Sequence, residues 1–183
     1  MVIDFRRNTE PVQPVVIKGE SVEIVSTYKY LGVVIDDKLD WSNQADSVYK
    51  KGQTRLFFLR KLRSFKVCSR MLCMFYHSMV SCVLTFALVC RGGNASEHDT
   101  GRLNKLIKKA LSSVGQPLDQ LERILENRLS RKSKTILQCL EHPLHSTLVG
   151  RHSVFRNRHL LPKIKTNRFR SSFLPAAIRD PSS

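Results

Sequence analysis

The sequence lacks the cysteine spacing that marks a disulfide framework or a zinc ribbon. Its five cysteines form an odd set without a Cys-x-x-Cys pair, and three of them lie in an apolar stretch. They are Cys68, Cys73, Cys82, Cys90 and Cys139. Because disulfides belong to oxidising compartments, this usage predicts reduced thiols in an intracellular protein.

An apolar leader is also missing from the start of the printed sequence. Residues 1–6 contain no apolar run of the length that a signal peptide needs. We therefore expect an intracellular protein, in the nucleus or the cytoplasm, that is not secreted.

Residue sets that would support independent catalysis are missing too. No Ser, His and acid set is evident, no Gly-rich phosphate loop follows a strand, and no His is followed two residues later by Asp or Glu. Cys139, His142 and His145, with His152 beyond them, could present metal ligands. However, Pro143 lies among them and the spacing matches none of the common zinc fingers. We expect no metal site, no resident cofactor and no enzyme activity of the chain on its own.

Acidic residues are scarce in the second part of the chain. Residues 1–50 hold six Lys or Arg against eight Asp or Glu, a net charge of −2, whereas residues 51–183 hold 25 against seven, a net charge of +18. A positive field of this size favours a polyanionic partner, and nucleic acid is the commonest one. An anionic membrane and a merely solvated basic surface are the alternatives.

Short runs rich in β-branched and aromatic residues fill the first 40 positions. Residues 2–5, 12–17, 22–25 and 28–35 read as strands without helices between them. The remainder reads as helices, so the predicted fold class is α+β: a small N-terminal antiparallel β-sheet followed by a mainly α-helical bundle.

A long amphipathic helix is predicted to begin just after Trp41, where Asp40 or Ser42 can cap it. A 3.6-residue period gathers one apolar stripe: Ala45, Val48, Tyr49, Gly52, Leu56 and Leu59. The opposite face collects the candidate nucleic-acid contacts Lys50, Lys51, Phe57 and Lys61, with Phe58 beside them. Lysines around an aromatic ring suit a phosphate backbone with stacked bases. A second helix covering both phenylalanines is the alternative.

Residues 71–90 carry no charged side chain. That length could span a bilayer. Interior polar residues such as His77 and Ser81, and bases at both ends, favour instead the central helix of a bundle.

Two further helices follow. From Thr100 to Val114 one face is apolar, and the other holds the candidate phosphate contacts Arg102, Lys105, Lys108 and Lys109. Pro117 suits the first turn of a helix that runs to about Leu140. Residues 151–183 read as a basic arm that orders only on a partner.

Asp36 and Asp37 follow an apolar strand, as paired metal-binding carboxylates do in polymerases. A two-metal site needs a further carboxylate from another strand, and neither Asp4 nor Asp40 has a supporting motif. We interpret the pair as a strand exit and helix cap.

Several segments in combination resemble the C-terminal part of reverse transcriptases of non-LTR (LINE-type) retrotransposons. The main ones are Met1-Val2-Ile3-Asp4-Phe5-Arg6-Arg7, Tyr28-Lys29-Tyr30-Leu31-Gly32-Val33-Val34-Ile35-Asp36 with Leu39-Asp40-Trp41, and Phe58-Leu59-Arg60-Lys61-Leu62. Later segments at 81–86, 93–95, 102–107, 142–145 and 172–176 are similar to the same family.

This resemblance implies a palm remnant with a primer-grip-like hairpin at Tyr30, Leu31 and Gly32 in residues 1–40. Thumb-like helices in 41–92, a basic helical extension in 93–150 and the basic arm in 151–183 would follow. The metal-binding aspartates of the family are absent, so the resemblance implies an incomplete polymerase. Its partner would be RNA or an RNA/DNA primer–template duplex, and Mg²⁺ would serve only the intact parent enzyme. Arg91 departs from the family pattern, in which an aromatic residue, usually Trp, is expected there.

The first forty or so residues also resemble a segment grouped with the N-terminal region of AlkB-homologue proteins. That family modifies tRNA through a methyltransferase and a 2-oxoglutarate-dependent dioxygenase, and the likeness implies a non-catalytic accessory region. A membrane-associated structural module, and a truncated reading frame without cellular function, are the remaining alternatives.

Overall fold

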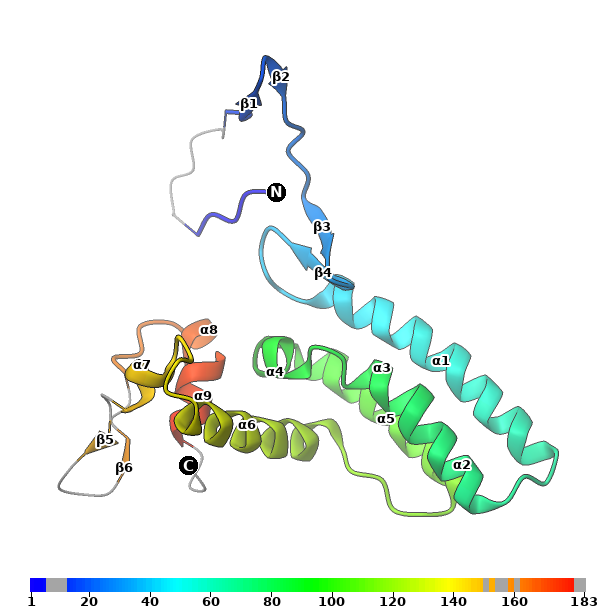
Figure 1. The fold of residues 1–183 in the computed structure, drawn as a ribbon. Coiled ribbons are helices and arrows are strands. Elements are labelled where there is room, and N and C mark those ends of the chain that lie inside the picture. The colour runs from blue at the N-terminus through cyan, green and yellow to red at the C-terminus, as the bar shows by residue number, and fades with distance from the viewer. Residues whose placement is uncertain (6–12, 150–151, 154–157, 160–161, 180–183) are drawn as a thin grey trace.

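The computed structural model describes residues 1–5, 13–149, 152–153, 158–159 and 162–179 (Figure 1). Its strands are β1 (Val16–Ile17), β2 (Glu20–Ser21), β3 (Thr27–Tyr30), β4 (Val33–Asp36), β5 (His152–Ser153) and β6 (Arg158–His159). Its helices are α1 (Ser42–Ser64), α2 (Ser69–Phe75), the π-helix η1 (Tyr76–Ser81), α3 (Cys82–Leu84), α4 (Leu88–Arg91), the 3-10 turn η2 (Gly92–Asn94), α5 (Glu97–Val114), α6 (Leu121–Gln138), α7 (His145–Val149), α8 (Asn167–Arg170) and α9 (Phe173–Arg179). The predicted α+β class is confirmed.

The N-terminal strands form separate antiparallel hairpins, β1 with β2 and β3 with β4, and not the single four-stranded sheet that we predicted. Residues 28–35, predicted as one strand, turn back at Leu31 and Gly32, whose φ angles of 47° and 83° suit a tight hairpin turn. Residues 2–5 form no strand. The apolar pattern continues through the turn, so the pattern alone could not locate it.

α1 begins just after Trp41, as we predicted from the capping residues Asp40 and Ser42. The Asp40 carboxylate accepts hydrogen bonds from the Ser42 backbone N–H at 2.9 Å and from the Ser42 hydroxyl at 2.8 Å. The hydrogen bond from the Ser42 backbone N–H is the largest of the effects that hold the pKa of Asp40 below its ordinary value. Gln44 ties the helix to β4, because its side-chain oxygen accepts from the Val34 N–H at 2.8 Å.

The predicted apolar stripe of α1 is confirmed. Ala45, Val48, Gly52, Leu56 and Leu59 are buried, and Tyr49 is half-buried. Side chains of Leu84 and Leu106 lie so close to Gly52 that a Cβ there would meet them at 2.9 and 3.0 Å. Glycine therefore allows the three helices to approach one another at this level.

The charge-free segment 71–90 is not one regular α-helix. It passes from α2 through η1 to α3 and breaks at residues 85–87, where Ala87 has a φ of 51°. The stretch Ser69–Asn94 has a mean hydropathy of 1.9, so by length and composition alone it could cross a membrane, and 33% of its apolar window is buried. This middle helical segment, the second of three in chain order, lies beside α1 and α5, which also pack on each other (Figure 1). One side therefore joins the core, and the other side faces outward.

α5 completes this three-helix bundle. Ser96 caps it by accepting a hydrogen bond from the Asp99 N–H at 3.0 Å, and Gly115, with a φ of 75°, ends it. The core draws on α1, the middle segment, α5 and the start of α6: Val48, Leu56, Leu59, Leu72, Tyr76, Val80, Leu84, Leu88, Leu103, Leu106, Ile107, Ala110, Val114 and Leu121. Since α5 shares this core with α1, the boundary that we predicted between 41–92 and 93–150 does not separate two packing units.

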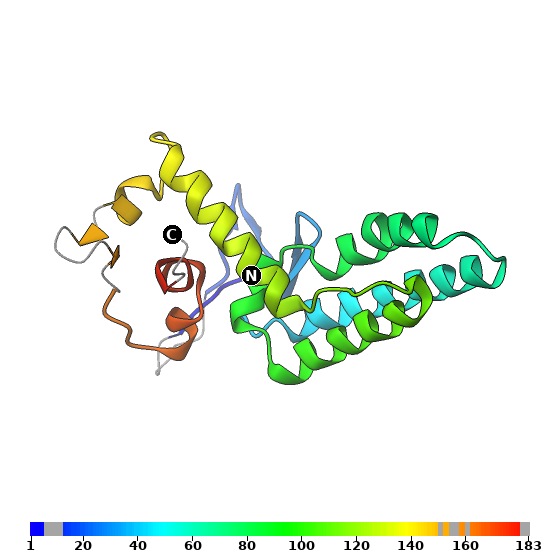
Figure 2. The same ribbon diagram turned by 90° about the horizontal axis from the view of Figure 1, so that it is seen from below.

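A second, smaller core lies beyond the first part of α6. Ile136, Leu148 and Ile178 form it, bringing together α6, α7 and α9. These elements lie apart from the far end of the bundle (Figure 2). We expected residues 151–183 to order only on a partner, but residues 162–179 pack here, with Pro175 and Ala177 buried. The rest of that arm, apart from the strand pair β5 and β6, lies outside the described residues.

Candidate nucleic-acid interface

One ion pair sets the geometry of the candidate interface. The Arg102 guanidinium on α5 donates to the Asp46 carboxylate on α1 at 2.7 Å and lies 4.5 Å from the centre of the Tyr49 ring. It also contacts Asp99, one turn earlier on α5, at 3.3 Å. The hydrogen bond that Arg102 donates to Asp46 is the main reason why the pKa of Arg102 is raised. Arg102, predicted as a phosphate contact, is thus paired with a carboxylate of the protein at the surface.

This contact also shows that α1 and α5 run parallel. Arg102 meets Asp46, and further along both helices a Cβ on Gly52 would meet Leu106. Both helices therefore run in the same direction. The residues on the side of α1 next to α5 can be identified from the spacing of three or four residues that places side chains on one side of a helix.

On α1 that side continues from Asp46 at intervals of three or four residues through Lys50, Gln53, Phe57 and Lys61. All four of these residues are exposed. They span about 16 Å from Lys50 to Lys61 at the rise of an α-helix, over which one strand of a duplex carries about five phosphates.

On α5 the same side continues from Arg102 to Lys105 and Lys109, with Lys108 turned further toward solvent. All three lysines are exposed. We call Lys50, Phe57, Lys61, Lys105, Lys108 and Lys109 the basic face. Asp46 is the acid at its edge, and Arg102 neutralises it.

Lys51 and the two neighbouring phenylalanines lie at the outer edge of α1. Lys51 is exposed, and Phe57 and Phe58 are 61% and 52% exposed. Their rings meet edge to face with centroids 5.6 Å apart. No helix covers them in the described part of the chain, so the ring of Phe57 is available for stacking.

The primer-grip-like residues lie at the tip of the β3–β4 hairpin. Tyr30 and Leu31 are 58% and 79% exposed, and Gly32 faces the ring of Phe86, which a Cβ there would meet at 3.5 Å. The hairpin is therefore placed against the break in the middle helical segment.

Asp36 and Asp37 occupy the exit of β4. Asp36 is 5% exposed, and one of its oxygens accepts from the backbone N–H groups of Lys38 and Asp40 at 3.0 and 3.1 Å. Its other oxygen is buried without a hydrogen-bond partner. Throughout the described residues, no three His, Cys, Asp or Glu side chains gather closely enough to hold a metal ion.

The histidines near Cys139 make separate local contacts. His142 accepts a hydrogen bond from the Leu144 N–H at 3.1 Å, and the His145 ring lies 3.1 Å from the Ile136 carbonyl. The side chain of His152, the fourth residue of that predicted group, lies outside the described part of the structure.

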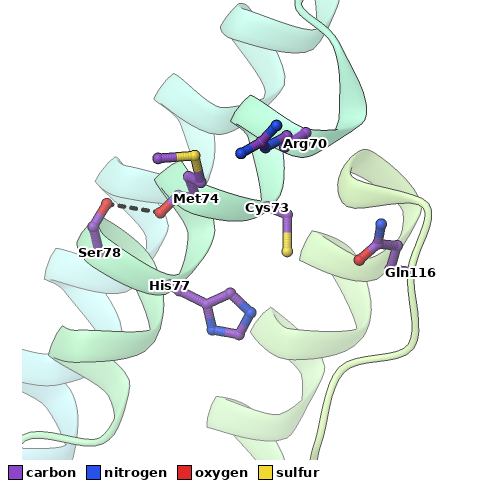
Figure 3. Close-up of a pocket in the computed structure, with 6 residues that line it drawn as sticks. All are labelled: Arg70, Cys73, Met74, His77, Ser78 and Gln116. Atoms are coloured by element: carbon purple, nitrogen blue, oxygen red, sulfur yellow. Dashed lines mark hydrogen bonds between the residues drawn. The ribbon is translucent and has the colours of Figure 1, made fainter.

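An open pocket of about 620 Å³ lies between the middle helical segment and the loop after α5 (Figure 3). Its lining consists of Arg70, Cys73, Met74, His77, Ser78 and Gln116. Ser78 donates its hydroxyl to the Met74 carbonyl at 2.8 Å. None of the six residues named above is a carboxylate that could orient His77 for catalysis.

Arg91 fills the position where the resemblance implies an aromatic residue. It is 1% exposed and donates to the carbonyls of Leu84 at 2.6 Å and Phe86 at 3.3 Å, which the helix break leaves free. Burial lowers its pKa. Arg128 of α6 binds the Thr85 carbonyl between them at 2.7 Å. The spacing of the sequence gave no sign of this pair of arginines.

Comparison with known proteins gives one match. A family model described as the N-terminal region of alkylated DNA repair protein alkB homolog 8 matches residues 41–81. This is less than a quarter of the chain and covers α1, α2 and η1, whereas we expected the AlkB-homologue likeness in the first forty or so residues. None of the curated proteins and none of the solved structures match. The comparisons thus give no support to the reverse-transcriptase resemblance.

Proposed function

We propose that the chain is a non-catalytic nucleic-acid-binding module of the AlkB-homologue N-terminal type. The family match at α1, α2 and η1 supports the type. In this proposal the module holds RNA for a tRNA-modifying methyltransferase or 2-oxoglutarate-dependent dioxygenase carried elsewhere.

The observation that carries the proposal is the basic face. Five lysines and one exposed aromatic ring lie along the adjoining sides of two parallel helices, and the acid at their edge is already paired with Arg102. Lysines are point charges that attract phosphate without reading sequence, and a ring between them can stack on an unpaired base. We therefore expect binding with weak sequence preference.

The test compares two sets of substitutions with equal loss of charge. Lys105→Gln, Lys108→Gln and Lys109→Gln remove charge from the basic face, and Arg131→Gln, Lys132→Gln and Lys134→Gln remove the same charge from the exposed side of α6. At about 0.1 M salt the first set should weaken binding to single-stranded RNA by about tenfold or more, and the second by much less. Equal losses would contradict a defined face.

A reverse-transcriptase thumb is the second candidate, and the position of the β3–β4 hairpin favours it. The hairpin that holds Tyr30, Leu31 and Gly32 directly precedes the bundle and contacts its middle segment near Phe86. As a thumb, the chain would prefer a primer–template duplex to single-stranded RNA, and it would not extend the primer with Mg²⁺. Extension by the isolated chain would exclude an incomplete enzyme.

A further inference from the structure

A second surface lies on the other side of α1 from α5. Five large apolar side chains are exposed there on α1, the loop after it and the middle segment: Phe58 (52%), Phe65 (67%), Met71 (61%), Met74 (64%) and Met79 (41%). We call these residues the methionine face.

A hydrogen bond between two elements places them together. Arg55 of α1 donates to the Met79 carbonyl at 2.6 Å and also reaches the Cys82 sulfur at 3.5 Å. Phe58 follows Arg55 by one turn on the same side of α1. Met71 lies two turns before Met79 on the segment that runs back along α1 (Figure 1). The apolar side chains therefore line two antiparallel neighbours.

The surroundings of this face carry charge of one sign. From Ser47 to Ser96 the chain contains no Asp or Glu and nine Lys or Arg. They are Lys50, Lys51, Arg55, Arg60, Lys61, Arg63, Lys66, Arg70 and Arg91. Three of these bases adjoin the apolar side chains. Arg55 donates to the Met79 carbonyl, Lys61 Nζ lies 5.4 Å from the centre of the Phe65 ring, and Arg70 directly precedes Met71. An occupant with carboxylates is therefore favoured and a basic one is repelled.

We propose that the methionine face docks an acidic amphipathic helix of a partner protein. Paired helices that expose apolar side chains receive such helices through residues at i, i+3, i+4 and i+7. Methionine is unbranched and polarisable, so it adapts to differing apolar surfaces. Carboxylates flanking the apolar side of the partner helix would meet Arg55, Lys61 and Arg70 at the rim.

Two other occupants fit less well. A bilayer needs an unbroken apolar side, but His77 and Ser78 are exposed between Met74 and Met79. A second copy of this chain would bring the same exposed bases against each other, and the whole chain carries a net charge of +16.

The probe is a fluorescent synthetic peptide of about 18 residues, five helical turns, built from Leu, Ala and Glu with leucine at the i, i+3, i+4, i+7 positions. Binding to the full chain is measured by anisotropy. Phe58→Ser with Met71→Ser should weaken it by about tenfold or more. Leu111→Ser with Leu140→Ser, two exposed apolar residues outside the face, should change it by less than about twofold. Both pairs are exposed, so the fold should survive in each.

Two outcomes would overturn the proposal. One is equal binding of a peptide in which Lys replaces each Glu. The other is absence of peptide binding at about 100 μM, whether or not vesicles of phosphatidylserine and phosphatidylcholine bind the chain. RNA binding separates the two surfaces: Phe57→Ser, in the basic face, should weaken it, whereas Met71→Ser, in the methionine face, should not.

Discussion

At the scale of single residues, Arg91 shows how a position that departs from a family pattern can still be well packed. A buried cation without a carboxylate costs free energy, but Arg91 supplies donors to two carbonyls that the helix break leaves free. A bulky apolar residue there would leave those acceptors without a partner.

Arg91→Met should therefore lower the free energy of unfolding by about 2–3 kcal/mol, the cost of leaving two buried acceptors unpaired. Urea denaturation followed by circular dichroism measures it. Arg131→Met, at an exposed position on α6, is the control, with an expected change of less than about 0.5 kcal/mol. If Arg91→Met is as stable as the parent, the hydrogen bonds from Arg91 to the Leu84 and Phe86 carbonyls do not stabilise the fold.

Tyr76 predicts how stability depends on alkaline pH. Burial raises its pKa to about 12 from 10.0. Between these values the unfolded chain has lost the phenol proton and the folded chain keeps it, so the contribution to stability is complete below pH 10 and is lost as the pH rises toward 12. Tyr76→Phe should therefore show a shallower loss over this window, by on the order of 2 kcal/mol.

Ultraviolet titration of tyrosinate gives an independent check of Tyr76. The absorbance change that is missing from Tyr76→Phe should coincide with the loss of circular dichroism, because Tyr76 ionises only as the fold opens. Appearance of that absorbance change while the protein is still folded would contradict the burial argument.

The residues whose position follows from local spacing were predictable from the sequence. The buried stripe of α1, the capping by Asp40 and the exposure of Lys105 each depend on neighbours within a few turns. The Arg102–Asp46 pair joins positions 56 residues apart, and no periodicity connects them. For this reason the sequence predicted Arg102 as a free phosphate contact, whereas in the structure it pairs with Asp46.

At the scale of elements, the hairpin and the broken middle segment account for the largest differences from prediction. Residues 71–90 are apolar in sequence, which predicts one helix, but the break depends on donors from Arg91 and from Arg128 on α6. The strand pattern of residues 28–35 likewise hides a turn. In both segments, contacts between elements override the local helix or strand propensity.

Gly93 connects the bundle to the C-terminal elements. A Cβ at this position would overlap the backbone carbonyl of Ser171, between α8 and α9. Gly93→Ala should therefore displace α8 and α9, and hydrogen exchange should rise in residues 162–179 while α1 and α5 stay protected. Gly101→Ala, where a Cβ would meet nothing within 4 Å, is the matched control and should leave exchange unchanged. Equal exchange in both variants would contradict the packing at Gly93.

At the scale of the whole molecule, the charge division predicted from the sequence becomes a division of surfaces. The acidic strand region leads into a bundle that presents basic residues with exposed aromatic and methionine side chains. The overall charge and the fold class were accessible from composition, whereas the grouping of five lysines on one face required the parallel packing of α1 and α5.

The most direct test of nucleic-acid binding at this face is the salt dependence of affinity, measured by anisotropy with a labelled single-stranded RNA. Five lysine contacts predict a slope of log K against log salt of about −3.5, and Lys105→Gln, Lys108→Gln with Lys109→Gln should reduce its magnitude by about 2. The matched α6 set, Arg131→Gln, Lys132→Gln with Lys134→Gln, should leave the slope almost unchanged. Binding that does not change with salt, or the same slope in all three proteins, would contradict the account.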